Sequence, residues 1–179
     1  MGTRSWDAEV NSVEITEAVT GSRDLDDAAQ VWAEATAARD GSADVADLSV
    51  SRLVLEAVLD RSPSSFVLIA RDDDGSAAGF AAVEPAGATV AEVCYFGVHP
   101  GHWGQGVGAV LLRSVQERLR ASGYRTAQLL VYTGNTRAVA LYERLGWQSA
   151  GSPEPHPRTG KPEQRYVLSL VTETEQQRS

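Results

Sequence analysis

An apolar, strand-like run is joined to a helix-like run by the stretch Gly97-Val98-His99-Pro100-Gly101-His102-Trp103-Gly104-Gln105-Gly106-Val107-Gly108. Three of its glycines, Gly104, Gly106 and Gly108, stand where the helix begins. A glycine costs a helix interior about 0.8 to 1 kcal/mol relative to alanine, which indicates that something approaches this backbone closely. Because the start of a helix presents unpaired N–H groups and the positive end of the helix dipole, the stretch predicts a site for an anion such as a phosphate.

The pattern on either side of this stretch predicts a mixed α+β fold. Apolar spacing predicts strands at 13–18, 66–70, 78–83, 89–98, 127–132, 147–150 and 165–171, and helices at 24–39, 51–59, 105–122 and 135–145. Tight turns between residues 66 and 98 favour an antiparallel meander, and the helix after residue 105 makes strands 89–98 and 127–132 parallel neighbours. Residues 151–162, with four prolines and two glycines, are predicted to be a loop. We expect a single domain over residues 1–179, with a core from about 13 to 171 and polar tails.

Composition and net charge disfavour some kinds of binding partner for this protein. The net charge of −8 argues against a nucleic-acid-binding protein, and slightly favours a cationic second ligand through long-range attraction. The first thirteen residues are too polar for a signal peptide, and no later run has the roughly 20 apolar residues of a membrane span. We therefore expect a cytoplasmic protein with no membrane partner. The single cysteine, Cys94, is predicted to be a small buried hydrophobic residue of a strand.

Two familiar phosphate loops do not match this one. A dinucleotide-binding loop needs Gly-x-Gly-x-x-Gly and an acidic residue about 20 positions later at the end of the next strand, and the strand 127–131 contains no acid. A nucleoside-triphosphate loop needs a lysine after its last glycine, and none follows Gly108. Both nucleotide classes are therefore disfavoured.

Two motifs together resemble the GCN5-related N-acetyltransferases. Residues 103–108 match the family signature Gln/Arg-x-x-Gly-x-Gly/Ala at both glycines, although Trp103 stands at its first position. The run Asn135-Thr136-Arg137-Ala138-Val139-Ala140-Leu141-Tyr142-Glu143-Arg144-Leu145-Gly146-Trp147 matches the second signature, Asn-x-x-Ala-x-x-Leu-Tyr-x-x-x-Gly-aromatic. The resemblance implies a central, mostly antiparallel sheet flanked by helices, with a splayed parallel strand pair at the cofactor site. It also implies acetyl-CoA as co-substrate, and we expect no metal.

The resemblance also assigns residues to the cofactor. Its pyrophosphate is expected on backbone amides from Gly104 to Ala109, and its pantetheine arm along the main chain at the end of strand 89–98. Asn135 is either the cap of its helix or a contact to pantetheine. The full expected set of cofactor-binding residues is Phe96, Gly97, Val98, Trp103, Gly104, Gln105, Gly106, Val107, Gly108, Ala109, Asn135, Arg137 and Tyr142.

Transfer of an acyl group to an amine requires an acid for the leaving thiolate and a base for the amine. By resemblance Tyr142 is the acid; the alternative is an aromatic residue that only packs. Glu92, a charged residue in an apolar strand, is the candidate base, and the alternative is a solvent-exposed or structurally paired glutamate. His99 and His102 are expected at the rim of the cofactor site.

The leading hypothesis is an N-acetyltransferase that acts on a primary amine of a small molecule or peptide, by direct attack in a ternary complex. A non-catalytic acyl-CoA-binding or regulatory domain is the alternative; it has no need of Tyr142 or Glu92. The helices within residues 24–59 either shape the acceptor pocket or are purely structural, and a homodimer is an open alternative to a monomer.

Overall fold

The computed structural model describes residues 13–171, and in this range one seven-stranded sheet has the order β1-β2-β3-β4-β5-β7-β6. The chain runs through β1 (Glu14–Ala18), α1 (Asp24–Asp40), α2 (Leu48–Arg61), β2 (Phe66–Arg71), β3 (Ala77–Pro85), β4 (Val90–Val98), the short 3-10 helix η1 (Pro100–His102), α3 (Val107–Ala121), β5 (Thr126–Tyr132), α4 (Thr136–Arg144), β6 (Gln148–Pro155) and β7 (Pro162–Ser169). All neighbouring strands are antiparallel except β4 and β5. The predicted mixed fold, with its antiparallel meander and one parallel pair, is confirmed.

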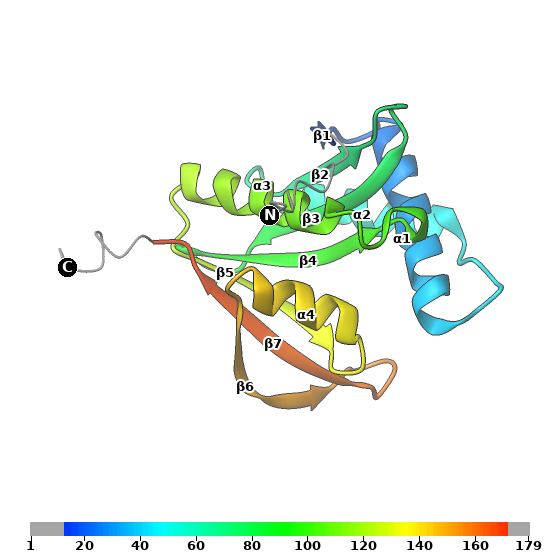
Figure 1. Cartoon of the computed structure of the whole chain (residues 1–179). Coiled ribbons are helices and arrows are strands. Elements are labelled where there is room, and N and C mark those ends of the chain that lie inside the picture. Colours follow the sequence, from blue (N-terminus) through cyan, green and yellow to red (C-terminus); the bar gives the residue numbers. More distant parts are fainter. Residues whose placement is uncertain (1–12, 172–179) are drawn as a thin grey trace, which may run out of the picture.

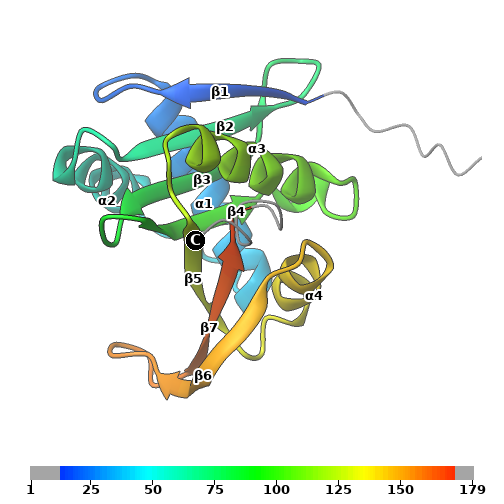
Figure 2. The same ribbon diagram turned by 90° about the vertical axis from the view of Figure 1, so that its left-hand side faces the viewer.

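Strand alternation divides the apolar side chains between two layers. On β2, Phe66 and Leu68 join a core with α3, while Val67 and Ile69 join a core with α1 and α2. Figure 2 shows α3 in front of strands β2–β4 and α1 behind them. The sheet is therefore the middle layer, and helices cover both of its faces at β2 and β3.

The parallel strands β4 and β5 pair over a short distance. Their register contains only the partners Val90–Thr126, Ala91–Ala127 and Glu92–Gln128, although β4 continues to Val98 and β5 to Tyr132. Figure 1 shows the two strands diverging beyond this common start. In the part of the chain that the structure describes, the β5 side of β4 after Glu92 has no strand partner, which leaves its main-chain groups open to a ligand.

The predicted loop at 151–162 is wrong over half of its length. Strand β6 continues from Gln148 to Pro155, so the loop between β6 and β7 covers only residues 156–161. β6 is the last strand of the sheet, and its pairing with β7 shifts between Ala150 and Glu154. An edge strand tolerates proline because one of its sides needs no N–H donors. Pro153 lies within the shift and does not end the strand, whereas Pro155 is its last residue.

No helix in residues 13–171 is long and apolar enough to cross a membrane.

Candidate active site

A cleft of about 680 Å³ lies where β4 and β5 diverge. Its walls come from the second half of α1, the end of β4, the loop and first turn of α3, and α4. Twelve of the fourteen residues expected at the site line it: Phe96, Gly97, Val98, Trp103, Gly104, Gly106, Val107, Gly108, Ala109, Asn135, Arg137 and Tyr142. Gln105 and Glu92 are outside the lining. The folding of the chain thus brings the two signature motifs to one cavity.

The glycine loop places unpaired amides at the start of α3. Gly104 and Gly106 have φ angles of 78° and 84°, which side chains rarely adopt, and Gly106 caps α3 without a side-chain bond. The amide of Ala109 already donates to the Gly106 carbonyl (3.0 Å), so it is less available than expected. Among the described residues no backbone bond is made by the N–H groups of Gly104, Gly106, Val107 and Gly108. These four amides are available to an anion, as expected from the sequence.

Gly108 allows α3 to approach α4 and β4 closely. A Cβ atom on Gly108 would lie 2.9 Å from Leu141 Cδ2 and 3.4 Å from both Phe96 Cζ and Val98 Cγ2. A side chain at position 108 would therefore require the Leu141 side chain to move. Gln105, in contrast, turns its side chain back to its own loop, where Nε2 donates to the carbonyl of Gly101 (2.8 Å).

Trp103 and Arg137 meet at this cleft from opposite walls. The indole N–H of Trp103 donates to the carbonyl of Val98 (2.8 Å), at the end of β4. The guanidinium carbon of Arg137, in the first turn of α4, lies 3.8 Å from the centre of the Trp103 ring. This stack connects the glycine loop with α4.

Tyr142 is buried on the inner face of α4. Its ring lies 6.0 to 6.3 Å from the rings of Phe96, Trp147 and Tyr166. Burial raises the pKa of the Tyr142 phenol well above its usual value, so the hydroxyl keeps its proton at neutral pH. No hydrogen bond joins this hydroxyl to another residue in the described part of the chain, and Tyr142 is one of the residues that line the cleft.

Glu92, unlike Tyr142, does not line the cleft. It is the last residue of β4 that pairs with β5, and its neighbours Ala91 and Val93 belong to the α3 core, so its own side chain is on the opposite face of the sheet. Its Oε2 accepts a hydrogen bond from Gln128 Nε2 (2.6 Å) and lies 4.0 Å from Arg165 Nη1. The structure therefore pairs Glu92 and does not bring it to the cleft lining.

Asn135 and the two histidines all have partners within the chain. Asn135 caps α4, since its Oδ1 accepts from the amide of Ala138 (3.3 Å), and it also lines the cleft. His102 lines the cleft with its Nε2 3.2 Å from Asp72, whereas His99 is bound to Glu34 (2.7 Å) outside the lining. The rim position expected for the histidines holds for His102.

The charges of the cleft differ in sign from the charge of the whole chain. Its lining contains Arg39, Arg137 and Arg144 and no carboxylate, although the chain has a net charge of −8. The Nε and Nη2 groups of Arg39 donate to Oδ1 and Oδ2 of Asp40, at 2.9 Å each. The local surplus of guanidinium groups suits an anionic ligand.

Helix α1 closes the far side of the cleft and contacts the β6–β7 turn. Arg39 lies over the ring of Tyr132 at 5.4 Å, Lys161 lies over the same ring at 5.7 Å, and Lys161 pairs with Asp40 at 3.6 Å. No sequence motif marks the cleft residues of α1, such as Trp32 and Arg39. They share a helix face at i, i+7 spacing, but that spacing does not tell which face meets a ligand.

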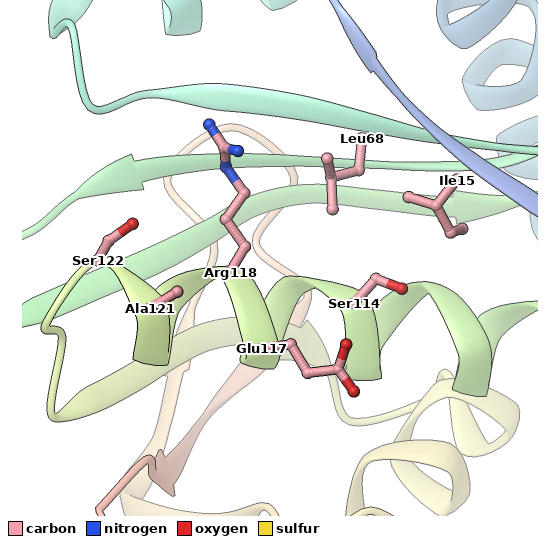
Figure 3. Close-up of a pocket in the computed structure, with 7 residues that line it drawn as sticks. All are labelled: Ile15, Leu68, Ser114, Glu117, Arg118, Ala121 and Ser122. Atoms are coloured by element: carbon pink, nitrogen blue, oxygen red, sulfur yellow. The ribbon is translucent and has the colours of Figure 1, made fainter.

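A second depression, of about 470 Å³, lies between α3 and the strands β1 and β2 (Figure 3). Of its polar residues, Arg118 is bound to Glu17 (2.9 Å) and lies over the ring of Phe66 at 4.8 Å. It contains none of the residues that the sequence predicts for a site.

Comparison with known proteins identifies the family. A family model described as "Acetyltransferase (GNAT) family" matches residues 28–147. The chain belongs to the GNAT acetyltransferase family. A mycothiol acetyltransferase from Clavibacter sepedonicus is 38% identical over 84 residues, which are 47% of this chain and 27% of that protein. The chain thus spans about a quarter of the length of this curated relative.

Solved GNAT structures share the fold of this chain. The ribosomal-protein-S18-alanine N-acetyltransferase from Escherichia coli aligns with a TM-score of 0.70 and 22% identity, over 90% of this chain and 96% of that one. The protein yncA from Salmonella typhimurium, solved with its cofactor acetyl-CoA, aligns with a TM-score of 0.68 and 20% identity, over 90% and 95% of the two chains. The family model thus identifies the family of the chain, and the solved structures show the shared fold.

Proposed function

We propose that the protein transfers the acetyl group of acetyl-CoA to a primary amine of a small molecule or peptide, by direct attack in a ternary complex. The observation that carries the proposal is the cleft walled by α1, the end of β4, the start of α3 and α4. It joins unpaired amides and arginines, which suit phosphates, to a buried and protonated tyrosine. The yncA structure, solved with acetyl-CoA, has the same fold and supports the choice of co-substrate.

The main chain of the cleft suits the two parts of the coenzyme. The amides of Gly106, Val107 and Gly108 would bind the pyrophosphate at the positive end of α3. The open side of β4 would pair with the amides of the pantetheine arm, as an added strand pairs with a sheet edge. Phe96 and Val98 are the proposed partners there, and the carbonyl of Val98, which already accepts from Trp103, keeps a second lone pair for this bond.

Tyr142 is the proposed general acid. The amine nitrogen attacks the thioester carbon, the C–S bond breaks, and the Tyr142 hydroxyl gives its proton to the departing sulfur. The raised pKa of Tyr142 ensures that the proton is present before transfer. Glu92 lies outside the cleft and is bound to Gln128, so it would take the proton of the amine only through intervening water.

The test compares two buried tyrosines of the same cluster. Tyr142→Phe is expected to lower kcat by about 10²- to 10⁴-fold, the range for loss of a general acid, and to leave the Kd of acetyl-CoA unchanged. Tyr166→Phe is the control, because Tyr166 lies 6.3 Å from Tyr142 but bonds to Glu143 and does not line the cleft. Turnover is followed as acetyl-CoA consumption with a panel of amines. Unchanged turnover of Tyr142→Phe would show that the tyrosine only packs.

The cofactor assignment has a separate test in thermal unfolding. A ligand at 100 times its Kd stabilises a protein by about 2.7 kcal/mol, so acetyl-CoA is expected to raise the Tm by several degrees. NAD and ATP are expected to leave it unchanged. Equal stabilisation by all three would contradict the assignment. Stabilisation by acetyl-CoA without turnover of any amine would favour the non-catalytic acyl-CoA-binding alternative.

A further inference from the structure

Helix α2 has an apolar stripe on its outward face. Its inward residues Leu55 and Val58 are fully buried in the core that it shares with α1 and the sheet. A helix turns by about 100° per residue, so Val50, Leu53 and Ala57, spaced by three and four residues, share the face that points away from that core. Val50 is 60% exposed and Leu53 is 63% exposed. Figure 2 shows α2 at the left edge of the molecule, so these three residues, the α2 stripe, face solvent.

The strongly exposed large apolar residues of the chain are concentrated around the α2 stripe. Within residues 13–171 they are Val19, Val45, Leu48, Val50, Leu53 and Leu130. Four of these six lie in residues 45–53, on the α1–α2 connection and the start of α2. Single exposed apolar residues are normal on a protein surface, whereas a continuous apolar patch marks a contact surface. The concentration therefore indicates a surface that another molecule covers.

Negative charge surrounds the α2 stripe. Residues 40–60 contain five carboxylates and one arginine, and that arginine already binds two carboxylates. Asp47 caps the N-terminal end of α2, and Asp60, three residues after Ala57, stands at the other end on the face of the stripe. In the described part of the chain no cation pairs with either of these two carboxylates. Each end of the stripe thus carries a negative charge that no cation neutralises.

This charge selects among the kinds of molecule that cover an apolar surface. Nucleic acids and anionic membranes are negatively charged themselves, so the carboxylates repel both. A second copy of the chain is disfavoured for the same reason. A two-fold contact of the stripe with itself would bring carboxylates of the two copies together, whether the helices are parallel or antiparallel, because both ends carry one. A polypeptide with basic residues around an apolar face has the complementary charge.

We propose that the α2 stripe is the docking surface for a basic, amphipathic helical segment of a protein partner. The apolar face of that segment covers Val50, Leu53 and Ala57, and its lysines or arginines meet Asp47 and Asp60. Helix α2 has 14 residues and is about 21 Å long, enough for a helix of three to four turns to pack along it. None of the stripe residues lines the cleft. The docking surface is therefore separate from the proposed acetyl transfer, and neither depends on the other.

The experiment titrates the full-length protein with a fluorescent synthetic peptide of about 14 residues, the length of α2. Its leucines share one helical face, its other residues are lysine, and its N-terminus is acetylated. Fluorescence anisotropy is expected to show binding with a micromolar Kd. A peptide with glutamate in place of every lysine is expected to bind at least about 10-fold more weakly, because its charge has the same sign as the surface. A peptide with serine in place of every leucine is expected to show a similar loss, because it has no apolar face.

Point variants locate the binding surface. Leu53→Gln keeps a good helix former but removes the apolar contact, and it is expected to weaken binding of the lysine peptide by about 10-fold. Leu130→Gln is the matched control, because Leu130 is an exposed leucine of β5, far from α2 in sheet order. Asp60→Asn is expected to weaken binding by about 2- to 5-fold at low salt and by less at high salt. Asp74→Asn, in the exposed turn between β2 and β3, is its control. Circular dichroism melts confirm that each variant is folded.

Three results would overturn the proposal. The first is a Leu53→Gln variant that binds the lysine peptide as tightly as the wild type and Leu130→Gln do. The second is equal binding of the lysine and glutamate peptides, or no binding of either. The third is a dimer of the wild type in sedimentation velocity that Leu53→Gln dissociates, since a second copy would then cover the stripe.

Discussion

Gly97 on β4 is expected to be intolerant of even one methyl group. It is paired across the sheet with Phe80, whose ring is fully buried. A Cβ atom on Gly97 would lie 2.8 Å from Phe80 Cε1 and 3.5 Å from Cδ1. Carbon atoms in contact prefer about 3.5 to 4.0 Å, so the ring or the strand must move by several tenths of an ångström. The buried position of Phe80 leaves the ring little space for this.

The magnitude follows from two opposing terms. Adding a methyl group to a filled core costs about 1 to 3 kcal/mol. Replacing glycine by alanine also restricts the unfolded chain, which returns about 0.4 to 1 kcal/mol. Gly97→Ala is therefore expected to lower the free energy of unfolding by about 1 to 2 kcal/mol, or the Tm by about 2 to 8 °C for a chain of this length.

Urea unfolding of three single variants and one double variant tests this reasoning. Gly134→Ala is the matched control, because Gly134 lines the same cleft, has no positive φ and has no atom within 4 Å of the point where a Cβ would lie. It is expected to be as stable as the wild type or slightly more stable. Phe80→Leu removes the ring atoms that the methyl group added by Gly97→Ala would meet, so the double variant is expected to lose less than the sum of the two single losses. Strict additivity, or a Gly97→Ala protein as stable as Gly134→Ala, would refute the steric argument.

Two further predictions concern a helix cap and a thiol. Asn135→Ala removes the acceptor for the amide of Ala138 and is expected to cost about 1 kcal/mol in urea unfolding, whereas Asn135→Asp keeps an acceptor oxygen and most of the stability. Burial, with the nearby carboxylates of Glu84 and Glu92, raises the pKa of the Cys94 thiol from 9.0 to about 12. The thiol of the unfolded chain ionises first, so the stability that the neutral, buried thiol contributes is fully present below pH 9. At higher pH the free energy of unfolding declines, by up to about 1.4 kcal/mol per pH unit. Cys94→Ala is expected to flatten the alkaline decline in unfolding free energy; an unchanged slope would contradict this.

Much of the fold follows from local patterns. On α3, Leu111, Val115 and Leu119 are spaced for one helical face, and all three are fully buried against the sheet. The parallel pairing of β4 with β5 also follows, because a helix between two strands carries the chain back to the same end of the sheet. These elements are predictable because their signals lie within a few residues of one another.

The strand β6 shows where a local signal misleads. Its residues Gly151, Pro153 and Pro155 are typical of loops. The strand nevertheless continues past the irregularity that contains Gly151 and Pro153, because it pairs with β7 again at Glu154 and Pro155. Whether a proline breaks a strand depends on which side of the strand faces a neighbour, and that is decided by the order of the whole sheet. The extent of β6 therefore needs tertiary information that the sequence does not state locally. Cys94 is similar: it was expected to be buried, and it is only half-buried.

The charge of the cleft, like the extent of β6, could not be predicted from the sequence alone. The net charge of −8 is a sum over the chain and determines the long-range field, which favours the approach of a cationic amine. The lining of the cleft contains arginines from α1 and α4 and no carboxylate. A phosphate held there depends on contacts within a few ångströms, because solvent screens charges beyond about 8 to 10 Å. The two charge distributions therefore act on different ligands, so an acidic protein can hold an anionic coenzyme and still attract an amine.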